Sequence, residues 1–161
     1  MRVASEHGAL SEEFDHLALR VEAEGPWLAD VGFGDSFLGP LQFTSGLEQK
    51  DSAADFRLTE VGGRWQLERH QPDGSWRLVY DLSPQPRDLS EFANRCRYHQ
   101  TSPKSHFTRN RICSMARPDG RITLSDMRLI ITSAGIRREQ VLPSEGDWRL
   151  ALRDHFGVVL S

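Results

Sequence analysis

The first regular pattern along the chain is an alternation of apolar and polar residues that begins after residue 16. In residues 17–22 the larger apolar side chains stand at every second position, which predicts a β-strand with one side facing solvent. A Glu-Gly-Pro turn signal at 24–26 follows, and the apolar run 27–33 predicts a second strand that ends at Gly34. Together these segments predict a β-hairpin.

Short strands are predicted through the rest of the first half. Residues 37–43 are apolar but contain a Gly-Pro pair, which predicts an irregular segment or a short edge strand. Residues 44–53 are polar and predict a loop. Period-two patterns around 56–58, 65–67 and 76–80, separated by turns rich in Gly and Pro, predict an antiparallel meander. Such a meander leads to a barrel or a sandwich.

The spacing becomes helical after residue 86. Asp88 is placed to cap a helix whose apolar residues recur at three- and four-residue steps as far as Cys96, and Pro103 ends it. Four further strands are predicted at 111–116, 121–124, 127–132 and 136–142, with one turn at Pro118-Asp119-Gly120. Ser144 then opens a closing helix.

These patterns predict a mostly β protein of the α+β class, with two domains. Residues 1–86 form a β domain that carries the first hairpin. Residues 87–161 form a domain with a helix, antiparallel strands and a C-terminal helix. A chain of 161 residues is long enough for one core or for two small lobes that share one.

Composition narrows the class of protein. The net charge is −3 and the pI is about 6.1, without the basic excess typical of a nucleic-acid-binding protein. Residues 1–14 lack the apolar core of a secretion signal, and no apolar run is long enough for a membrane span. The two cysteines lie far apart, so they form neither a disulfide framework nor a zinc pattern. We therefore expect a cytoplasmic protein without a metal site.

A His and an Asp occupy matching places in the predicted hairpin. His16 and Asp30 are equidistant from residue 23, so we expect them to be cross-strand neighbours or one diagonal step apart. In that arrangement the carboxylate orients the imidazole and stabilises its cation, as a general base requires. The alternative is an exposed ion pair worth about 0–1 kcal/mol.

The residues around this pair resemble the arylamine N-acetyltransferase family. In that family one strand carries the triad His just before an apolar alternation, and a D-V-G-F-G segment in the next strand carries the triad Asp. Residues 15–21 (DHLALRV) and 30–34 (DVGFG) match these two features. The resemblance implies that His16 and Asp30 belong to a Cys-His-Asp triad.

The resemblance also implies contacts to two substrates. Residues 98–107 (YHQTSPKSHF) resemble the family's segment after its barrel, where an S-x-F lies near the active-site cleft. The residues implied to bind the acceptor are Phe33, Gly34 and Phe107, and those implied to touch the coenzyme are Thr101 and Ser105. Gly32 and Gly34 match glycines that let backbone and substrate approach closely, because they lack a Cβ.

The family fold is an N-terminal helical bundle, an antiparallel β-barrel and an α/β lid, in a papain-like arrangement. The resemblance covers nearly the whole chain after about residue 14, so it implies a barrel at 1–86 and a lid at 87–161. The family's nucleophilic Cys lies in an R-G-G-x-C type motif upstream of the His, whereas residues 1–15 contain no Cys. We expect the chain to begin after the helical bundle.

Neither cysteine is expected to replace this nucleophile. Cys96 lies on the apolar stripe of its predicted helix and is expected to fill a core. Cys113 lies inside a predicted strand and is also expected to pack. The basic residues Lys104, Arg109 and Arg111 form either a solvated surface or a site that attracts the phosphates of coenzyme A.

The function implied by the resemblance is acetyl transfer from acetyl-CoA to an arylamine, arylhydrazine or N-hydroxyarylamine, by covalent ping-pong catalysis without a metal. Three interpretations stay open. The chain is a piece of such an enzyme whose helical segment with the Cys is missing or is a separate chain; it is an inactive remnant that binds coenzyme A or a protein; or it is a hydrolase that uses the His–Asp pair on water. We expect the chain alone to be inactive and to self-associate through an apolar patch around His16, Phe33 and Phe107.

Overall fold

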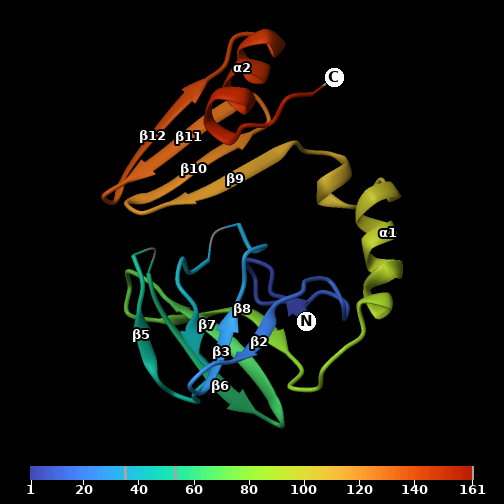
Figure 1. Ribbon diagram of the computed structural model, residues 1–161, viewed down its shortest axis with the longest axis vertical. Helices are drawn as coiled ribbons and strands as arrows, with labels where there is room; N and C mark the ends of the chain where they lie inside the picture. The colour runs from blue at the N-terminus through green and yellow to red at the C-terminus, as the bar shows by residue number, and fades with distance from the viewer. Residues whose placement is uncertain (35, 53, 161) are drawn as a thin grey trace. The chain divides into compact units, whose positions relative to one another are not determined.

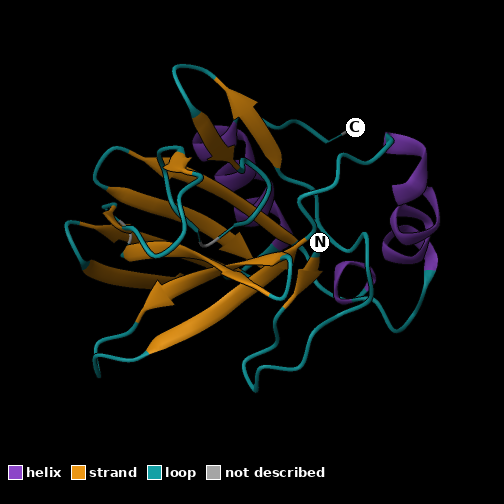
Figure 2. Ribbon diagram, turned by 90° about the horizontal axis from the view of Figure 1, so that it is seen from below, coloured by secondary structure: helices purple, strands orange, loops and turns teal. Residues whose placement is uncertain are grey.

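The computed structural model describes residues 1–34, 36–52 and 54–160, and it contains two compact units, Met1–Cys96 and Arg97–Ser161 (Figure 1). Each unit has its own antiparallel sheets and its own buried core, and strands make up most of the regular structure (Figure 2). The predicted α+β class is confirmed. The boundary between the units falls inside a helix, and the domain division at residues 86 and 87 stays a prediction.

The larger sheet of the first unit contains the predicted meander. Its three central strands are β6 (Asp55–Val61), β7 (Arg64–His70) and β8 (Trp76–Leu82). They pair in the order of the sequence. Phe56 and Leu58 lie two residues apart on β6, and Leu67 lies opposite Leu58 on β7. All three side chains are completely buried, which explains the period-two pattern.

Two short strands complete this sheet, which has the order β1-β8-β7-β6-β5. β1 (Arg2–Val3) pairs with β8, and β5 (Glu48–Lys50) pairs with β6. The prediction of a loop over residues 44–53 was wrong at β5. The side chains of β5 are mostly exposed, so its sequence has no hydrophobic alternation that would predict a strand. The strand forms through backbone pairing with β6.

The smaller sheet contains the predicted hairpin and has the order β2-β3-β4. Its strands are β2 (Leu19–Glu22), β3 (Pro26–Ala29) and β4 (Leu41–Gln42). Every residue of β2 is exposed, so the prediction that one side of this strand is buried was wrong. β2 lies at the sheet edge, and the buried residue of the hairpin, Leu28, comes from β3.

The barrel implied for the first unit is replaced by two open sheets. β1 and β5 are the edges of one sheet, and β2 and β4 are the edges of the other. Leu28 and Leu41 of the smaller sheet join one core with Phe56, Leu67 and Tyr80 of the larger sheet. Packing of apolar faces therefore holds the two sheets together, in place of closure by backbone hydrogen bonds.

The predicted helix after residue 86 begins with a 3₁₀ turn, η1 (Leu89–Phe92), and continues as α1 (Ala93–Thr101). Asp88 caps the turn as predicted, and its backbone N–H donates to the Glu91 carboxylate at 2.9 Å. This contact satisfies a donor that the first helical turn leaves without a partner.

The expected burial of Cys96 was wrong, because Cys96 is exposed on α1. Phe92 packs edge-on against Phe14 with 5.2 Å between ring centroids, whereas Leu89 is exposed and α1 itself buries no residue. A 3₁₀ turn has 3.0 residues per turn and an α-helix has 3.6, so the change of helix type breaks the predicted apolar stripe.

The second unit is a four-stranded meander with one helix. Its strands are β9 (Ile112–Arg117), β10 (Gly120–Ser125), β11 (Arg128–Ser133) and β12 (Ile136–Val141), and its helix is α2 (Glu145–Phe156). The Ser144 hydroxyl accepts a hydrogen bond from the Asp147 N–H at 3.2 Å, which is the predicted cap. Trp148 and Leu152 of α2 share a core with Ile122 of β10.

Gly120 allows β10 to pass close to β11. A Cβ at this position would overlap the backbone carbonyl of Thr132, and the backbone φ is +153°. We expect Gly120→Ala to lower the free energy of unfolding by about 3 kcal/mol or more, because a backbone must move. Gly135→Ala is the control, since its Cβ meets open space at φ +77° and should cost about 1 kcal/mol. Equal losses for the two variants in chemical denaturation would contradict this account.

A partly buried charge cluster joins the first residues of the chain to the larger sheet. The side chain of Asp81 is only 4% exposed and forms ion pairs with Arg64 and with Arg2, whose Nη2 lies 3.1 Å away. Glu13 adds a second carboxylate 2.9 Å from Arg64. Burial alone would raise the pKa of the Asp81 carboxyl, but hydrogen bonds from Arg64 and Arg2 outweigh it and lower this pKa below its ordinary value.

This cluster should make stability depend on pH. Because the Asp81 pKa is lowered by folding, its contribution is complete above the unfolded pKa of about 4 and is lost as the pH falls through the folded pKa. We expect Asp81→Asn to cost about 2–3 kcal/mol at neutral pH and to remove part of the acid destabilisation. Glu22→Gln breaks an exposed ion pair and should cost less than about 1 kcal/mol. Denaturant unfolding between pH 7 and pH 3 measures both, and parallel curves for wild type and Asp81→Asn would refute the assignment.

Candidate functional site

The predicted contact between His16 and Asp30 is present. Nε2 of His16 lies 2.8 Å from Oδ2 of Asp30. Both residues lie just outside the strands, His16 before β2 and Asp30 directly after β3. Leu19 pairs with Ala29, so the hairpin is centred one residue later than predicted, and the two side chains meet on a diagonal.

The carboxylate of Asp30 is held by its own loop. Its side chain is 0% exposed, and Oδ1 accepts hydrogen bonds from the N–H groups of Gly32 at 3.1 Å and Phe33 at 3.2 Å. These bonds, with the contact to His16, replace the water that the buried carboxylate has lost. The D-V-G-F order thus has a physical reason, since the residues after the Asp turn back to bind it.

Gly32 leaves the space in which the imidazole lies. A Cβ on Gly32 would stand 3.3 Å from Cε1 of His16, closer than an ordinary contact, and 4.0 Å from Oδ1 of Asp30. The role of this glycine is therefore close approach to the His ring. Gly34, the other glycine of the motif, is an exposed turn residue.

Two aromatic rings pack around the imidazole. The Phe33 ring contacts His16 edge-on with 5.2 Å between centroids, and the Tyr80 ring lies 5.9 Å from His16 and 5.5 Å from Phe33. Tyr80 is completely buried. Burial first, and next the negative charge of Asp30, raise the pKa of the Tyr80 hydroxyl well above its ordinary value.

Tyr80 is a site residue that the sequence pattern did not identify. Its place in the alternation of residues 76–80 predicted only a strand position. The Tyr80 hydroxyl is buried and faces the Asp30 carboxylate. A phenol at a strand position that also faces a carboxylate can be recognised only once β8 is placed beside the Asp30 loop.

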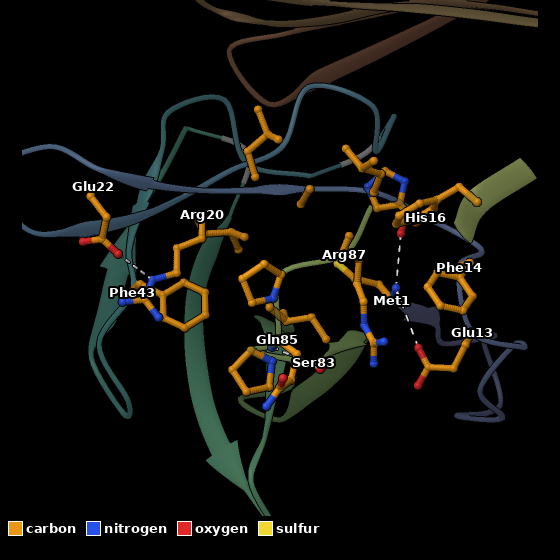
Figure 3. Close-up of a pocket in the computed structure, with 18 residues that line it drawn as sticks. Met1, Glu13, Phe14, His16, Arg20, Glu22, Phe43, Ser83, Gln85 and Arg87 are labelled. Carbon is orange, nitrogen blue, oxygen red and sulfur yellow. Dashed lines mark hydrogen bonds and ion pairs between the residues drawn. The ribbon is translucent and has the colours of Figure 1, made fainter. Parts of the chain in front are cut away.

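A pocket of about 440 Å³ opens beside His16, whose side chain is 15% exposed (Figure 3). Most of residues 13–22 line it together with residues 82–87. Arg20 bridges to Glu22 at 2.8 Å, and its guanidinium lies over the Phe43 ring. The lining therefore combines apolar side chains with charged ones, and Cys96 is not among the described residues that line the pocket.

The residues predicted to bind the coenzyme, and Phe107, lie in the second unit. Ser105 is 2% exposed, and its hydroxyl accepts from the Phe107 N–H at 3.3 Å and lies 3.1 Å from Nδ1 of His99. The Thr101 hydroxyl donates to the Arg97 carbonyl at 2.8 Å. Phe107 is 60% exposed. Each hydroxyl thus has a local structural bond, and contact with a coenzyme stays a prediction.

The second cysteine and two of the three basic residues have structural roles. Cys113 packs on the core of the second unit, and burial raises the pKa of its thiol, which disfavours a thiolate. Arg111 binds the Glu145 carboxylate at 2.8 and 3.0 Å, and its guanidinium lies 4.0 Å from the centre of the Trp148 ring. Arg109 donates to the Ser105 carbonyl at 3.3 Å.

Residues 2–161 match the family model of the N-acetyltransferases. The curated relatives and the structural neighbours are arylamine N-acetyltransferases. The chain belongs to the arylamine N-acetyltransferase family. A pineal-gland isozyme from Gallus gallus is 34% identical over 71% of this chain and 46% of its own length.

Solved structures of this family share the fold. The arylamine N-acetyltransferase of Salmonella typhimurium superposes with a TM-score of 0.90 at 25% identity, over 98% of this chain and 58% of its own. The enzyme of Mycobacterium marinum in complex with CoA gives a TM-score of 0.81 at 25% identity, over 96% of this chain and 56% of its own. The chain spans about half the length of its relatives in this family.

No helix in residues 1–34, 36–52 and 54–160 is both long and apolar enough to cross a membrane. Within the same ranges, no three or more His, Cys, Asp or Glu side chains are grouped as metal ligands.

Gly32 offers a direct test of this acetyltransferase-family site. We expect Gly32→Ala to push the His16 ring by a few tenths of an ångström, weaken its bond to Asp30 and cost about 1 kcal/mol of stability. NMR of the ¹⁵N-labelled imidazole should show the Nε2–H signal of His16 shifted. Gly39→Ala is the control, because its Cβ meets nothing within 4 Å. Unchanged His16 signals in Gly32→Ala would show that the ring does not depend on this glycine.

Proposed function

We propose that His16 and Asp30 are the general base and the orienting carboxylate of an acetyl transfer from acetyl-CoA to an arylamine, arylhydrazine or N-hydroxyarylamine. The observation that carries the proposal is the contact of 2.8 Å between Nε2 and a completely buried carboxylate. Membership of the arylamine N-acetyltransferase family supports the reaction class.

The geometry supports an assignment of the two ring nitrogens. In the neutral imidazole, the Asp30 carboxylate favours the tautomer with its hydrogen on Nε2. Nδ1 then offers a lone pair to an incoming thiol, and the fixed negative charge of Asp30 stabilises the imidazolium that forms. Phe33 and Tyr80 restrict the ring to this orientation.

The thiol is proposed to come from a polypeptide segment other than these 161 residues. Cys96 is exposed on α1 and is not among the described residues that line the pocket beside His16, and Cys113 packs on the core of the other unit, where burial raises the pKa of its thiol. That pocket has apolar walls at Leu17 and Leu19, whose side chains are exposed. Such a surface suits a protein segment that brings a Cys to His16.

The proposed reaction has two halves. The thiol gives its proton to Nδ1 of His16, and the thiolate attacks the acetyl carbonyl of acetyl-CoA, so that an acetyl thioester forms and coenzyme A leaves with that proton. The amine then attacks the thioester, gives a proton to the imidazole and leaves acetylated, while the thiolate is released. The CoA complex of the Mycobacterium marinum relative supports acetyl-CoA as the donor.

The aromatic residues of the motifs are proposed to bind the acceptor. Phe33 lies against the imidazole, where an aromatic amine would approach the acyl group. Phe107 exposes most of its ring in the other unit. Thr101 and Ser105 are proposed to contact the coenzyme, because they lie in the segment whose resemblance to the family carries this assignment.

We expect the chain alone to release no coenzyme A from acetyl-CoA in the presence of an aminobenzoate, because the first half-reaction lacks a poised thiolate. Addition of the Cys-bearing segment of a relative, fused or as a separate chain, should restore turnover. The measurement is a coenzyme A release assay on both preparations. Acetylation by the bare chain that survives replacement of Cys96 and Cys113 would overturn the mechanism.

In the restored protein, His16→Ala should nearly abolish acylation, because the thiol loses its base. Asp30→Asn should lower kcat/KM by about 10²–10⁴-fold, since the imidazole loses both its orientation and its counter-charge. The matched control is His70→Ala, an exposed histidine that packs on Trp76. We expect that control to retain activity, and an equal loss in all three variants would point to general misfolding.

A further inference from the structure

The loop that presents Phe107 is built around one buried hydroxyl. Ser105 caps the short helix η2 (His106–Thr108), where its Oγ accepts from the Phe107 N–H. Its backbone carbonyl accepts from the Thr108 hydroxyl at 3.0 Å. The position of the Phe107 backbone is thus set by Ser105, which is almost completely buried.

His99 connects this hydroxyl to the Phe107 side chain. Nδ1 of His99, in the last part of α1, lies 3.1 Å from Oγ of Ser105. The His99 ring also meets the Phe107 ring edge-on, at 5.1 Å between centroids and an interplanar angle of 90°. One imidazole therefore contacts both the hydroxyl that fixes the Phe107 backbone and the Phe107 ring itself.

A Ser–His pair also invites comparison with a nucleophile and its base. Two observations weigh against that role. Ser105 is 2% exposed, and its oxygen already accepts a backbone hydrogen bond as a helix cap. The pair is therefore built for positioning.

We infer that His99 is a positioning residue that sets the orientation of Phe107, and through it the affinity of the proposed acceptor site for an aromatic ring. This inference rests on the proposed role of Phe107. His99 has no contact with the reacting atoms in this role, so its loss changes acceptor binding and leaves the chemistry at His16 intact.

The test uses the whole chain with ¹³C-labelled Phe and follows the Phe107 ring signals by NMR. His99→Leu removes the hydrogen bond and the aromatic edge, and Ser105→Ala removes the same bond from the other partner. His99→Asn restores an amide group near the position of Nδ1. His106→Leu is the control, because His106 also lies beside Phe107, at 5.7 Å, but bonds to Asn110.

Without ligand, we expect His99→Leu and Ser105→Ala to move the Phe107 signals, His99→Asn to restore them in part, and His106→Leu to move them less. Titration with an aminobenzoate should show about three- to tenfold weaker binding in His99→Leu, the range that one edge-to-face contact supplies. Backbone amide spectra confirm that each variant is folded.

The ligand-free spectra test the positioning role of His99, and the titration tests the proposed acceptor site. Phe107 signals that stay in place in both His99→Leu and Ser105→Ala, or that move as far in His106→Leu, would overturn the positioning role. If His99→Leu moves Phe107 while the wild-type ring does not respond to the aminobenzoate, the positioning role is supported and the proposed acceptor site fails.

Discussion

The Asp30 carboxylate is completely shielded from solvent, and a buried charge is stable only when nearby donors replace the water that it has lost. Here the donors are the N–H groups of Gly32 and Phe33 and the imidazole of His16. This requirement folds the D-V-G-F segment back on itself and draws His16 to the end of β3. Burial of the phenol, and next the charge of Asp30 beside it, raise the pKa of Tyr80. Removing the charge would therefore free both the His16 ring and the 30–33 loop, and the close approach that requires Gly32 would be lost.

The first unit supports this arrangement without closing into a barrel. Its two sheets are open and share one apolar core, so β2 remains an exposed edge whose apolar side chains have no cover within the described part of the unit. A well-packed core beneath the hairpin and an open pocket beside His16 are both consequences. The core holds the imidazole in one orientation, and the pocket leaves a path to it. Both features suit the proposed role of His16 as a base for an incoming thiol.

Several polar residues that the sequence marks as candidate binding residues make structural contacts within the fold. The Ser105 hydroxyl caps a helical turn and meets His99, and Arg111 clamps Glu145 and stacks on Trp148. These side chains lie at junctions, where a loop meets a helix or a strand begins. Polar groups at such points must satisfy the backbone first. The contact of His99 with both Ser105 and Phe107 is one example of such a polar group that holds neighbouring residues in place.

The sequence by itself determined the meander strands, the closing helix with its Ser144 cap and the pairing of His16 with Asp30, because each depends on local periodicity or on separation along a hairpin. Only the tertiary structure decided that β5 is a strand, that Cys96 is exposed and that the sheets stay open. It also placed Tyr80 beside Asp30 and His99 beside Phe107. These outcomes depend on which distant segments pack together. A hydrophobic pattern along the chain indicates which side chains are buried, but it does not indicate which distant residues they pack against.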